Sequence, residues 1–415
     1  MTEMTPSLSL PHPGALDAFL RGRLLAQLAP LRAGCLRVCD ALGEAVLGDP
    51  AAATVVKVTI TDPAFYRKVA AQGSVGAGEA YINGDWRCDD LVALVRLLVR
   101  NRDLLDGMER GPARLGGWLL RGWNRLRRNS RRGSRRNIAA HYDLGNAFFS
   151  LFLSPDMMYS SALFASEDET LEQASTRKLD RICQQLDLQP GDRVVEIGTG
   201  WGGFALHAAR HYGCHVTTTT ISAEQHALAQ ARVEQAGLNQ RVSVLMQDYR
   251  DLDGQFDKLV SIEMIEAIGA EFLDTYFATL QRLLKPDGLA MLQAITIEDH
   301  RYRQALRSVD YIKRFVFPGS FIPSLNAIMA AKTRASDLQL IGQLDFGQSY
   351  ALTLRAWRQR FLAQHVAVRA QGFDDRFARL WEFYLAYCEG GFLERSIGVS
   401  QLLLARPGHR PALAG

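Results

Sequence analysis

A glycine-rich segment carries the residue types and spacing that could do chemistry. The run from Glu196 to Gly203 reads EIGTGWGG; it follows a buried apolar pattern and opens a helical one. Glycines let a backbone approach a ligand closely, and open α/β sheets bind ligands at the carboxyl ends of their strands. The segment therefore predicts a cofactor-binding loop.

Two cofactor classes fit this loop. A G-x-G-x-x-G spacing that ends at Gly203 is shared with dinucleotide-binding enzymes. The next predicted strand, however, ends in Thr218–Thr220 and lacks the acidic residue that holds the ribose of NAD. Glu196 before the glycines, and Gln247 and Asp248 after the third strand, suit S-adenosylmethionine (SAM) better. These residues favour a methyltransferase over a dehydrogenase and leave both open.

The elements around the loop alternate between strand and helix patterns. Such alternation predicts an α/β fold: a Rossmann-like, mostly parallel sheet with helices on both faces. The predicted strands are 193–198, 215–221, 242–248, 257–264, 288–297, 338–345 and 399–405, and the clearest helices between them are 202–212 and 222–237.

A small mixed α/β N-terminal domain precedes this sheet. Spaced leucine and arginine at 17–47 predict one or two helices, 54–60 predicts a strand, and the glycines of 73–86 predict turns. The chain thus divides into a lipid-associated domain (1–110), a linker or membrane-facing segment (111–136) and a catalytic domain (137–415).

Charge is unevenly spread along the 415 residues. The net charge is +4, but residues 111–136 contain nine arginines and no acidic residue, so the rest carries 4 − 9 = −5. Trp118 and Trp123 lie among these arginines, a composition that suits an anionic membrane surface as well as a solvated linker. No nucleic-acid-reading module accompanies them, so no nucleic-acid partner is expected.

The six cysteines lack the spacing of a metal site. No metal is therefore expected, and the cysteines indicate reduced thiols in a cytoplasmic protein.

Several longer motifs make the chain resemble the cyclopropane-fatty-acyl-phospholipid synthases, over about residues 55–405. The resemblance implies a SAM-methyltransferase fold acting on cis double bonds of phospholipid acyl chains, which removes the dehydrogenase alternative. It also implies an enzyme peripherally attached to the inner face of the membrane, and a homodimer, which is common in that family. The motifs are HYDLGNAFF (141–149), MMYSSALF (157–164), GTGWGG (198–203), TISAEQ (220–225), LLKPDG (283–288), YIKRFVFPG (311–319) and YLAYCEGGF (384–392).

The resemblance also implies which residues contact SAM, and Glu196 and Gly202 of the glycine loop complete that set. The implied contacts are Tyr159, Ser160, Gly198, Gly200, Thr219, Thr220, Gln225, Gln247 and Asp248.

The family's catalytic base is a bicarbonate ion, held by a cysteine, a glutamate, a histidine, a backbone amide and a tyrosine. In this chain the glutamate maps to Glu266, the amide to Ile295 and the tyrosine to Tyr350. The cysteine is replaced by Ser161 and the histidine by Gln293, which puts a bound bicarbonate in doubt.

Glu263 stands where the family usually has glycine. It is either a surface carboxylate paired with an arginine, or, as we hypothesise, a carboxylate that occupies the bicarbonate site. Two neighbouring carboxylates would raise one pKa and suit proton transfer. The expected product is a cyclopropane ring. A methyl- or methylene-branched chain, or a non-catalytic lipid- or SAM-binding relative, is the alternative.

Overall fold

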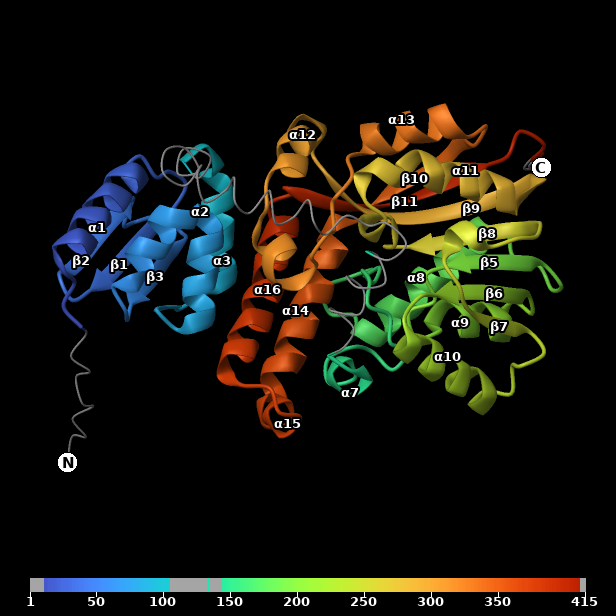
Figure 1. The fold of residues 1–415 in the computed structure, drawn as a ribbon, viewed down its shortest axis with the longest axis horizontal. Helices are drawn as coiled ribbons and strands as arrows, with labels where there is room; N and C mark the ends of the chain where they lie inside the picture. Colours follow the sequence, from blue (N-terminus) through green and yellow to red (C-terminus); the bar gives the residue numbers. More distant parts are fainter. Residues whose placement is uncertain (1–10, 105–132, 134–143, 411–415) are drawn as a thin grey trace. The chain divides into compact units, whose positions relative to one another are not determined.

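The computed structural model describes residues 11–104 and 144–410, together with Gly133. These residues form two compact units (Figure 1). The first unit contains 11–104, Ser308–Val316 and Gly372–Glu394, and the second contains the other described residues. The stretch expected as one catalytic domain thus contributes two segments to the first unit. Apart from Gly133, the arginine-rich segment 111–136 lies outside the described residues.

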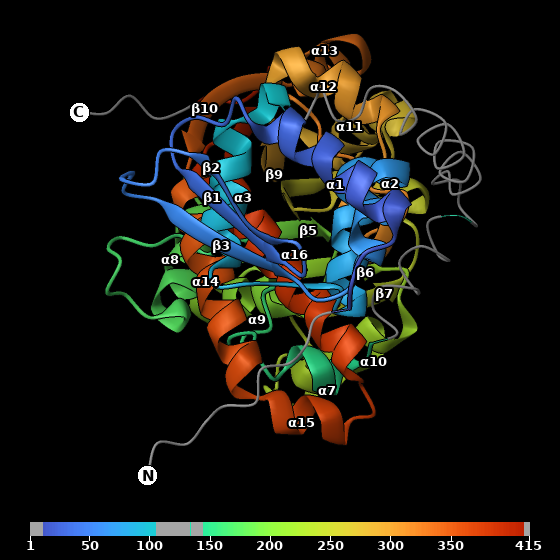
Figure 2. The ribbon, with the colours of Figure 1, turned by 90° about the vertical axis from the view of Figure 1, so that its left-hand side faces the viewer.

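The first unit contains a four-stranded mixed sheet in the order β2-β1-β3-β4. Strand β1 is antiparallel to β2 and parallel to β3, and helices α1 and α2 pack together beside the sheet (Figure 2). The elements are α1 (Ala15–Leu28), β1 (Cys35–Asp40), β2 (Gly43–Gly48), β3 (Val55–Ile60), α2 (Ala64–Asn83), β4 (Trp86–Cys88), α3 (Leu91–Arg100), a π-helical turn (Ile312–Val316) and α16 (Asp375–Leu393).

The helices predicted for 17–47 are wrong beyond Leu28, because a β-hairpin follows. In β1, Leu36 and Val38 are buried and the intervening Arg37 is exposed. This alternation places one face of the strand on the core, and pairing with β3 adds a partner that local sequence does not reveal.

The turns predicted for 73–86 are largely wrong, because α2 continues through most of this stretch. The prediction holds at two places: Gly73, with φ of 57° and ψ of −131°, kinks α2, and the left-handed Gly84 follows its end. A Cβ atom on Gly78 would lie 2.4 Å from the ring of Tyr311. A glycine at this position of α2 therefore allows the ring of Tyr311 to pack directly against the helix.

A second close approach joins α3 and α16 in this unit. A Cβ atom on Gly390 would lie 2.6 Å from Cγ1 and 2.8 Å from Cβ of Val95. We expect Gly390→Ala to destabilise the unit, since overpacking of a core costs about 1–3 kcal/mol. Urea denaturation followed by circular dichroism measures the change.

Gly22→Ala is the matched control, because Gly22 lies on an exposed part of α1 and a Cβ atom added there would meet nothing within 4 Å. It should stabilise the protein by about 1 kcal/mol through helix propensity. Equal shifts for the two substitutions would contradict the packing role of Gly390.

The second unit contains the predicted α/β sheet, with seven strands in the order β10-β11-β9-β8-β5-β6-β7. The five neighbouring strands β9, β8, β5, β6 and β7 are parallel to one another, and β11 is antiparallel to both β9 and β10. The fold class and all seven predicted strands are confirmed.

The seven strands and the helices α9 and α10 agree closely with the predicted ranges. The elements of this unit are α7 (Asn146–Phe149), α8 (Leu171–Gln185), β5 (Arg193–Ile197), α9 (Gly203–His211), β6 (His215–Thr220), α10 (Ala223–Gln235), β7 (Val242–Met246), β8 (Phe256–Ile262), α11 (Leu273–Leu283), β9 (Leu284–Ile297), α12 (Asp299–Arg307), α13 (Leu325–Ala335), β10 (Gln339–Asp345), α14 (Gly347–Ala363), α15 (His365–Ala370) and β11 (Ile397–Ala405).

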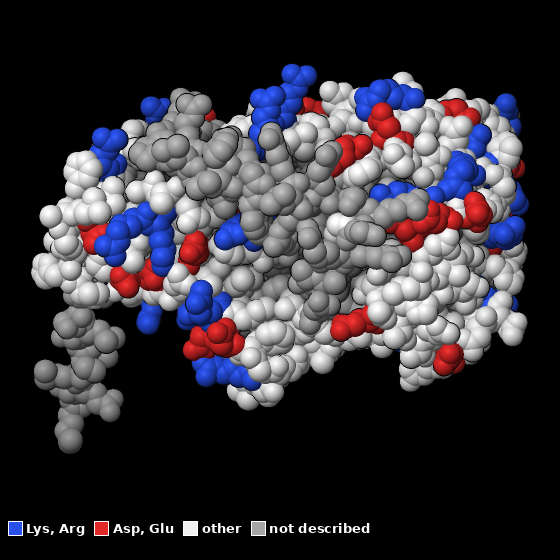
Figure 3. Space-filling view, viewed as in Figure 1, with Lys and Arg blue, Asp and Glu red and all other residues white. Residues whose placement is uncertain are grey.

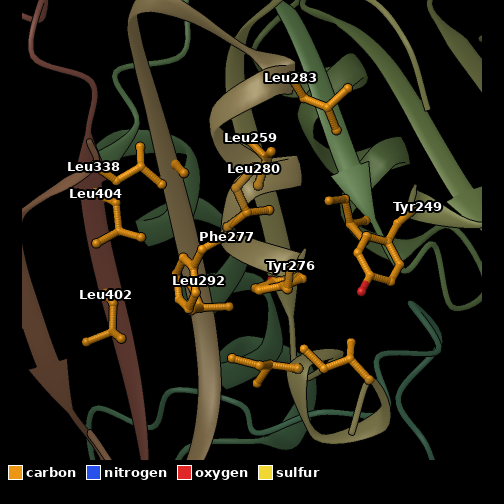
Figure 4. Close-up of a cluster of buried hydrophobic side chains, with 14 of the residues drawn as sticks. Tyr249, Leu259, Tyr276, Phe277, Leu280, Leu283, Leu292, Leu338, Leu402 and Leu404 are labelled. Atoms are coloured by element: carbon orange, nitrogen blue, oxygen red, sulfur yellow. The ribbon is translucent and has the colours of Figure 1, made fainter. Parts of the chain in front are cut away.

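Each face of the central strands has its own hydrophobic core. On one face, Leu259 and Leu292 pack with Phe277 and Leu280 of α11 (Figure 4). On the other face, the adjacent Val260 packs with side chains of α8 and α9. Burial on both faces explains the nearly continuous apolar strands, and it holds their carboxyl ends in place at one edge.

Charges of both signs occupy the face of the molecule that Figure 3 shows. On the face in Figure 3, basic and acidic side chains are interspersed outside the grey atoms. Within residues 11–104 and 144–410, no helix is long and apolar enough to cross a membrane, and no cluster of histidine, cysteine or acidic residues could hold a metal ion.

Candidate active site

The glycine loop leaves β5 with three residues in the left-handed region, Gly198, Gly200 and Gly202, at φ of 98°, 50° and 85°. The amides of Gly198 and Thr199 both donate to the carbonyl of Thr219, which ties the loop to the end of β6. A Cβ on Gly200 would meet nothing within 4 Å, and the buried Thr199 hydroxyl has no partner among the described residues. Open space beside an unpaired polar atom fits a bound cofactor such as SAM.

Strand ends beside this loop hold the other predicted cofactor residues, largely through bonds to one another. Thr218 donates to Glu196 at 2.6 Å, and burial raises the pKa of that carboxyl to about 8. Thr220 donates to Gln225 at 2.8 Å, and the hydroxyl of Thr219 donates to the carbonyl of Gln247.

Asp248 also lies at this edge. Its carboxylate accepts two hydrogen bonds from Arg250, at 2.8 and 2.6 Å, and Gln247 donates to a backbone carbonyl at 2.5 Å. The structure therefore brings the predicted set together, while several of its side chains already have partners within the protein.

Tyr159, Ser160 and Ser161 approach the same region from the segment before α8. The ring of Tyr159 lies 5.2 Å from those of Phe149 and Trp357 and 6.4 Å from that of Phe317, measured between centroids. The result is an aromatic cluster, whose electron-rich ring faces can stabilise positive charge.

The carboxylate of Glu263 lies at the centre of the predicted catalytic residues. Its Oε1 accepts from the Ser161 amide at 2.9 Å and from Gln293 Nε2 at 2.8 Å. Its Oε2 accepts from the Tyr350 hydroxyl at 2.6 Å. The donors come from the segment before α8, from β9 and from α14, so only the folded chain assembles them.

The backbone of Glu263 is in the left-handed region, at φ of 49°. Few residues other than glycine adopt this conformation, which costs roughly 1–2 kcal/mol for an L-residue. The position just after β8 therefore suits a glycine, and this chain instead holds a carboxylate there against that preference.

Glu266 accepts from the Ile295 amide through Oε1 at 2.6 Å, whereas its buried Oε2 has no partner among the described residues. Burial, and next the charge of Glu263, raise the pKa of Glu266 to about 8. Burial also raises the pKa of Glu263, against the lowering effect of its three hydrogen bonds. Glu263 has three donors and Glu266 has one, so the geometry stabilises the charged form of Glu263 more than that of Glu266.

All six predicted catalytic residues thus fall into two groups. Glu263 accepts hydrogen bonds from Ser161, Gln293 and Tyr350, and Glu266 accepts one from the amide of Ile295. No arginine bonds to Glu263 among the described residues, so the alternative of a surface carboxylate paired with an arginine does not match this geometry.

Sequence reasoning missed Lys178, Trp357 and Thr199. Lys178 is fully buried, and its spacing from Leu171, Leu179 and Ile182 places it on the apolar face of α8. A lysine at helical spacing from Leu171 and Ile182 was the available signal in the sequence.

Comparison with known proteins shows the family of this chain. Residues 129–402 match the family model described as "Mycolic acid cyclopropane synthetase". The chain belongs to this family. It is accordingly a SAM-dependent methyltransferase, as the glycine loop and the resemblance predicted.

Two curated relatives cover most of the chain. The tuberculostearic acid methyltransferase UfaA1 of Mycobacterium tuberculosis is 38% identical over 83% of this chain and 82% of its own length. The cyclopropane-fatty-acyl-phospholipid synthase of Escherichia coli is 37% identical over 84% and 87%, respectively. Among solved structures, the mycolic acid cyclopropane synthase CmaA1 complexed with SAH and CTAB has a TM-score of 0.61 and 29% identity, covering 65% of this chain and 98% of CmaA1.

Proposed function

We propose that this enzyme transfers the methyl group of SAM to a cis double bond in an acyl chain of a membrane phospholipid, and that Glu263 is the base. The observation that carries the proposal is the Glu263 carboxylate, held by Ser161, Gln293 and Tyr350. By resemblance, these are positions that hold a bicarbonate ion in the family. The enzyme therefore needs no bound bicarbonate.

SAM supplies an electrophilic methyl group, and its addition to the double bond leaves a positive charge on the acyl chain. The rings around Tyr159 exclude water and stabilise that charge. An ionised carboxylate has about four acceptor sites. Three are used on Glu263, so one remains on Oε2 to take the proton, beside the Tyr350 hydroxyl.

The position of this base decides the product. Three donors fix the Glu263 carboxylate, so its one remaining acceptor site on Oε2 takes only a proton that comes to it, and a cation whose methyl group is out of reach of this site persists longer. A neighbouring hydride can then move to the charged carbon before the new methyl group loses its proton. A fixed base therefore favours a methylene-branched chain, and the relative named a tuberculostearic acid methyltransferase, not a cyclopropane synthase, supports a methylated product.

A cyclopropane ring is the second candidate, supported by the Escherichia coli relative. It forms when the methyl group loses its proton before hydride migration. A relative that binds lipid or SAM without catalysis would have no need of a carboxylate held by three donors.

Product analysis tests the proposal. We expect phospholipids of expressing cells, supplied with methyl-deuterated methionine, to gain a branch that has lost one deuterium. Proton NMR of the product made with unlabelled methionine distinguishes the exocyclic alkene from a cyclopropane ring, which has the same mass. A ring would establish the second candidate, retention of every deuterium would refute proton removal from the methyl group, and no product would indicate a binding protein.

The partner that we propose is the anionic surface of a bilayer, at the inner face of the membrane. The support comes from the nine arginines of residues 111–136 and from the phospholipid synthase relative. A homodimer remains a prediction from the family resemblance.

A further inference from the structure

A buried lysine lies beside the proposed base. Lys178 of α8 has no exposed surface, and its Nζ donates to the hydroxyl of Ser160 at 2.8 Å. A buried ammonium group is costly unless carboxylates compensate its charge. The carboxylates around it therefore indicate what the lysine does.

Burial lowers the pKa of Lys178 to about 8, and the charges of Asp156, Glu263 and Glu196, in that order, oppose this shift. Asp156 is half-buried and accepts bonds from Ser154, Ser175 and the Met158 amide. Lys178 is the cation that acts on both Glu196 and Glu263. Glu266 and Tyr350 are the other titratable groups facing Glu263.

The hydrogen bond of Lys178 connects it to the same carboxylate by a second route. Ser160 accepts from Lys178, and the next residue, Ser161, donates its amide to Glu263. Holding Ser160 therefore fixes the peptide that orients the carboxylate. The lysine acts on Glu263 both through charge and through the backbone.

We infer that Lys178 is a positioning residue for the base: it keeps Glu263 ionised and holds the Ser160–Ser161 peptide against it. This inference rests on the proposed function, in which Glu263 takes the proton. Lys178 itself need not touch substrate.

The pH dependence of kcat tests this role. Lys178→Met removes the charge at similar length, so Glu263 should hold its proton to higher pH. The acid limb of the kcat profile should then move upward by about one pH unit or more. Lys178→Arg, which keeps the positive charge, should restore the limb toward the wild-type position.

The matched control is Lys332→Met, because Lys332 in α13 bonds only to a backbone carbonyl, that of Leu338. Its acid limb should stay at the wild-type position. If Lys178→Met does not fold, the shorter Lys178→Gln is measured. If neither neutral variant folds, Ser160→Ala should still lower kcat, and unchanged kcat in that variant would contradict the inference.

An unshifted acid limb in a folded neutral variant, with activity lowered equally at every pH, would mean that Lys178 has only a structural role. An acid limb that moves as far in Lys178→Arg as in Lys178→Met would also contradict the inference. A different result would refute the proposed function itself, namely a Glu263→Gln variant that remains active.

Discussion

Glu263→Gln should lower kcat by about 10²–10⁴-fold, the usual contribution of a general base. Glutamine has nearly the same shape and faces the same backbone conformation at φ of 49°. Its amide oxygen can still accept a hydrogen bond, but its NH₂ group cannot take a proton. Binding of SAM should change little, because Glu263 lies outside the glycine loop.

Methyl transfer from radiolabelled SAM to vesicles of unsaturated phospholipid measures this loss, and calorimetry measures SAM binding. Glu234→Gln is the matched control, because Glu234 lies on an exposed part of α10. Near-normal turnover in folded Glu263→Gln would exclude this carboxylate as the base.

Glu263→Gly should be almost inactive in buffer free of bicarbonate and should recover when bicarbonate is added. Glycine accepts the left-handed backbone without strain. It leaves the Ser161 amide, Gln293 and Tyr350 as free donors around a space where a small trigonal anion fits. The loss without bicarbonate should again be about 10²-fold or more.

Wild-type enzyme should show no bicarbonate dependence, because its own carboxylate fills the same donors. Nitrate, a trigonal anion but a very weak base, is the control and should not restore Glu263→Gly. Strong stimulation of the wild type by bicarbonate, or full activity of Glu263→Gly without it, would contradict a built-in base.

Local sequence was sufficient for elements whose own patterns match their environment. The strands of the second unit are apolar on both faces, and the glycine loop lies between a strand and a helix, so periodicity and glycine spacing located both. Prediction from local sequence was wrong at 35–48 and for most of 73–83. There, strand pairing and contacts with Tyr311 outweigh the preferences of the local residues.

The sequence by itself determined the α/β class, the cofactor loop and the presence of Glu263 where a glycine is usual. Only the tertiary structure decided what Glu263 does. Its three donors lie 102, 30 and 87 residues away from it along the chain. Lys178 of α8 acts on it through charge and through the Ser160–Ser161 peptide. A carboxylate's ionisation depends on groups within a few ångströms, and their proximity follows from packing that no local pattern encodes.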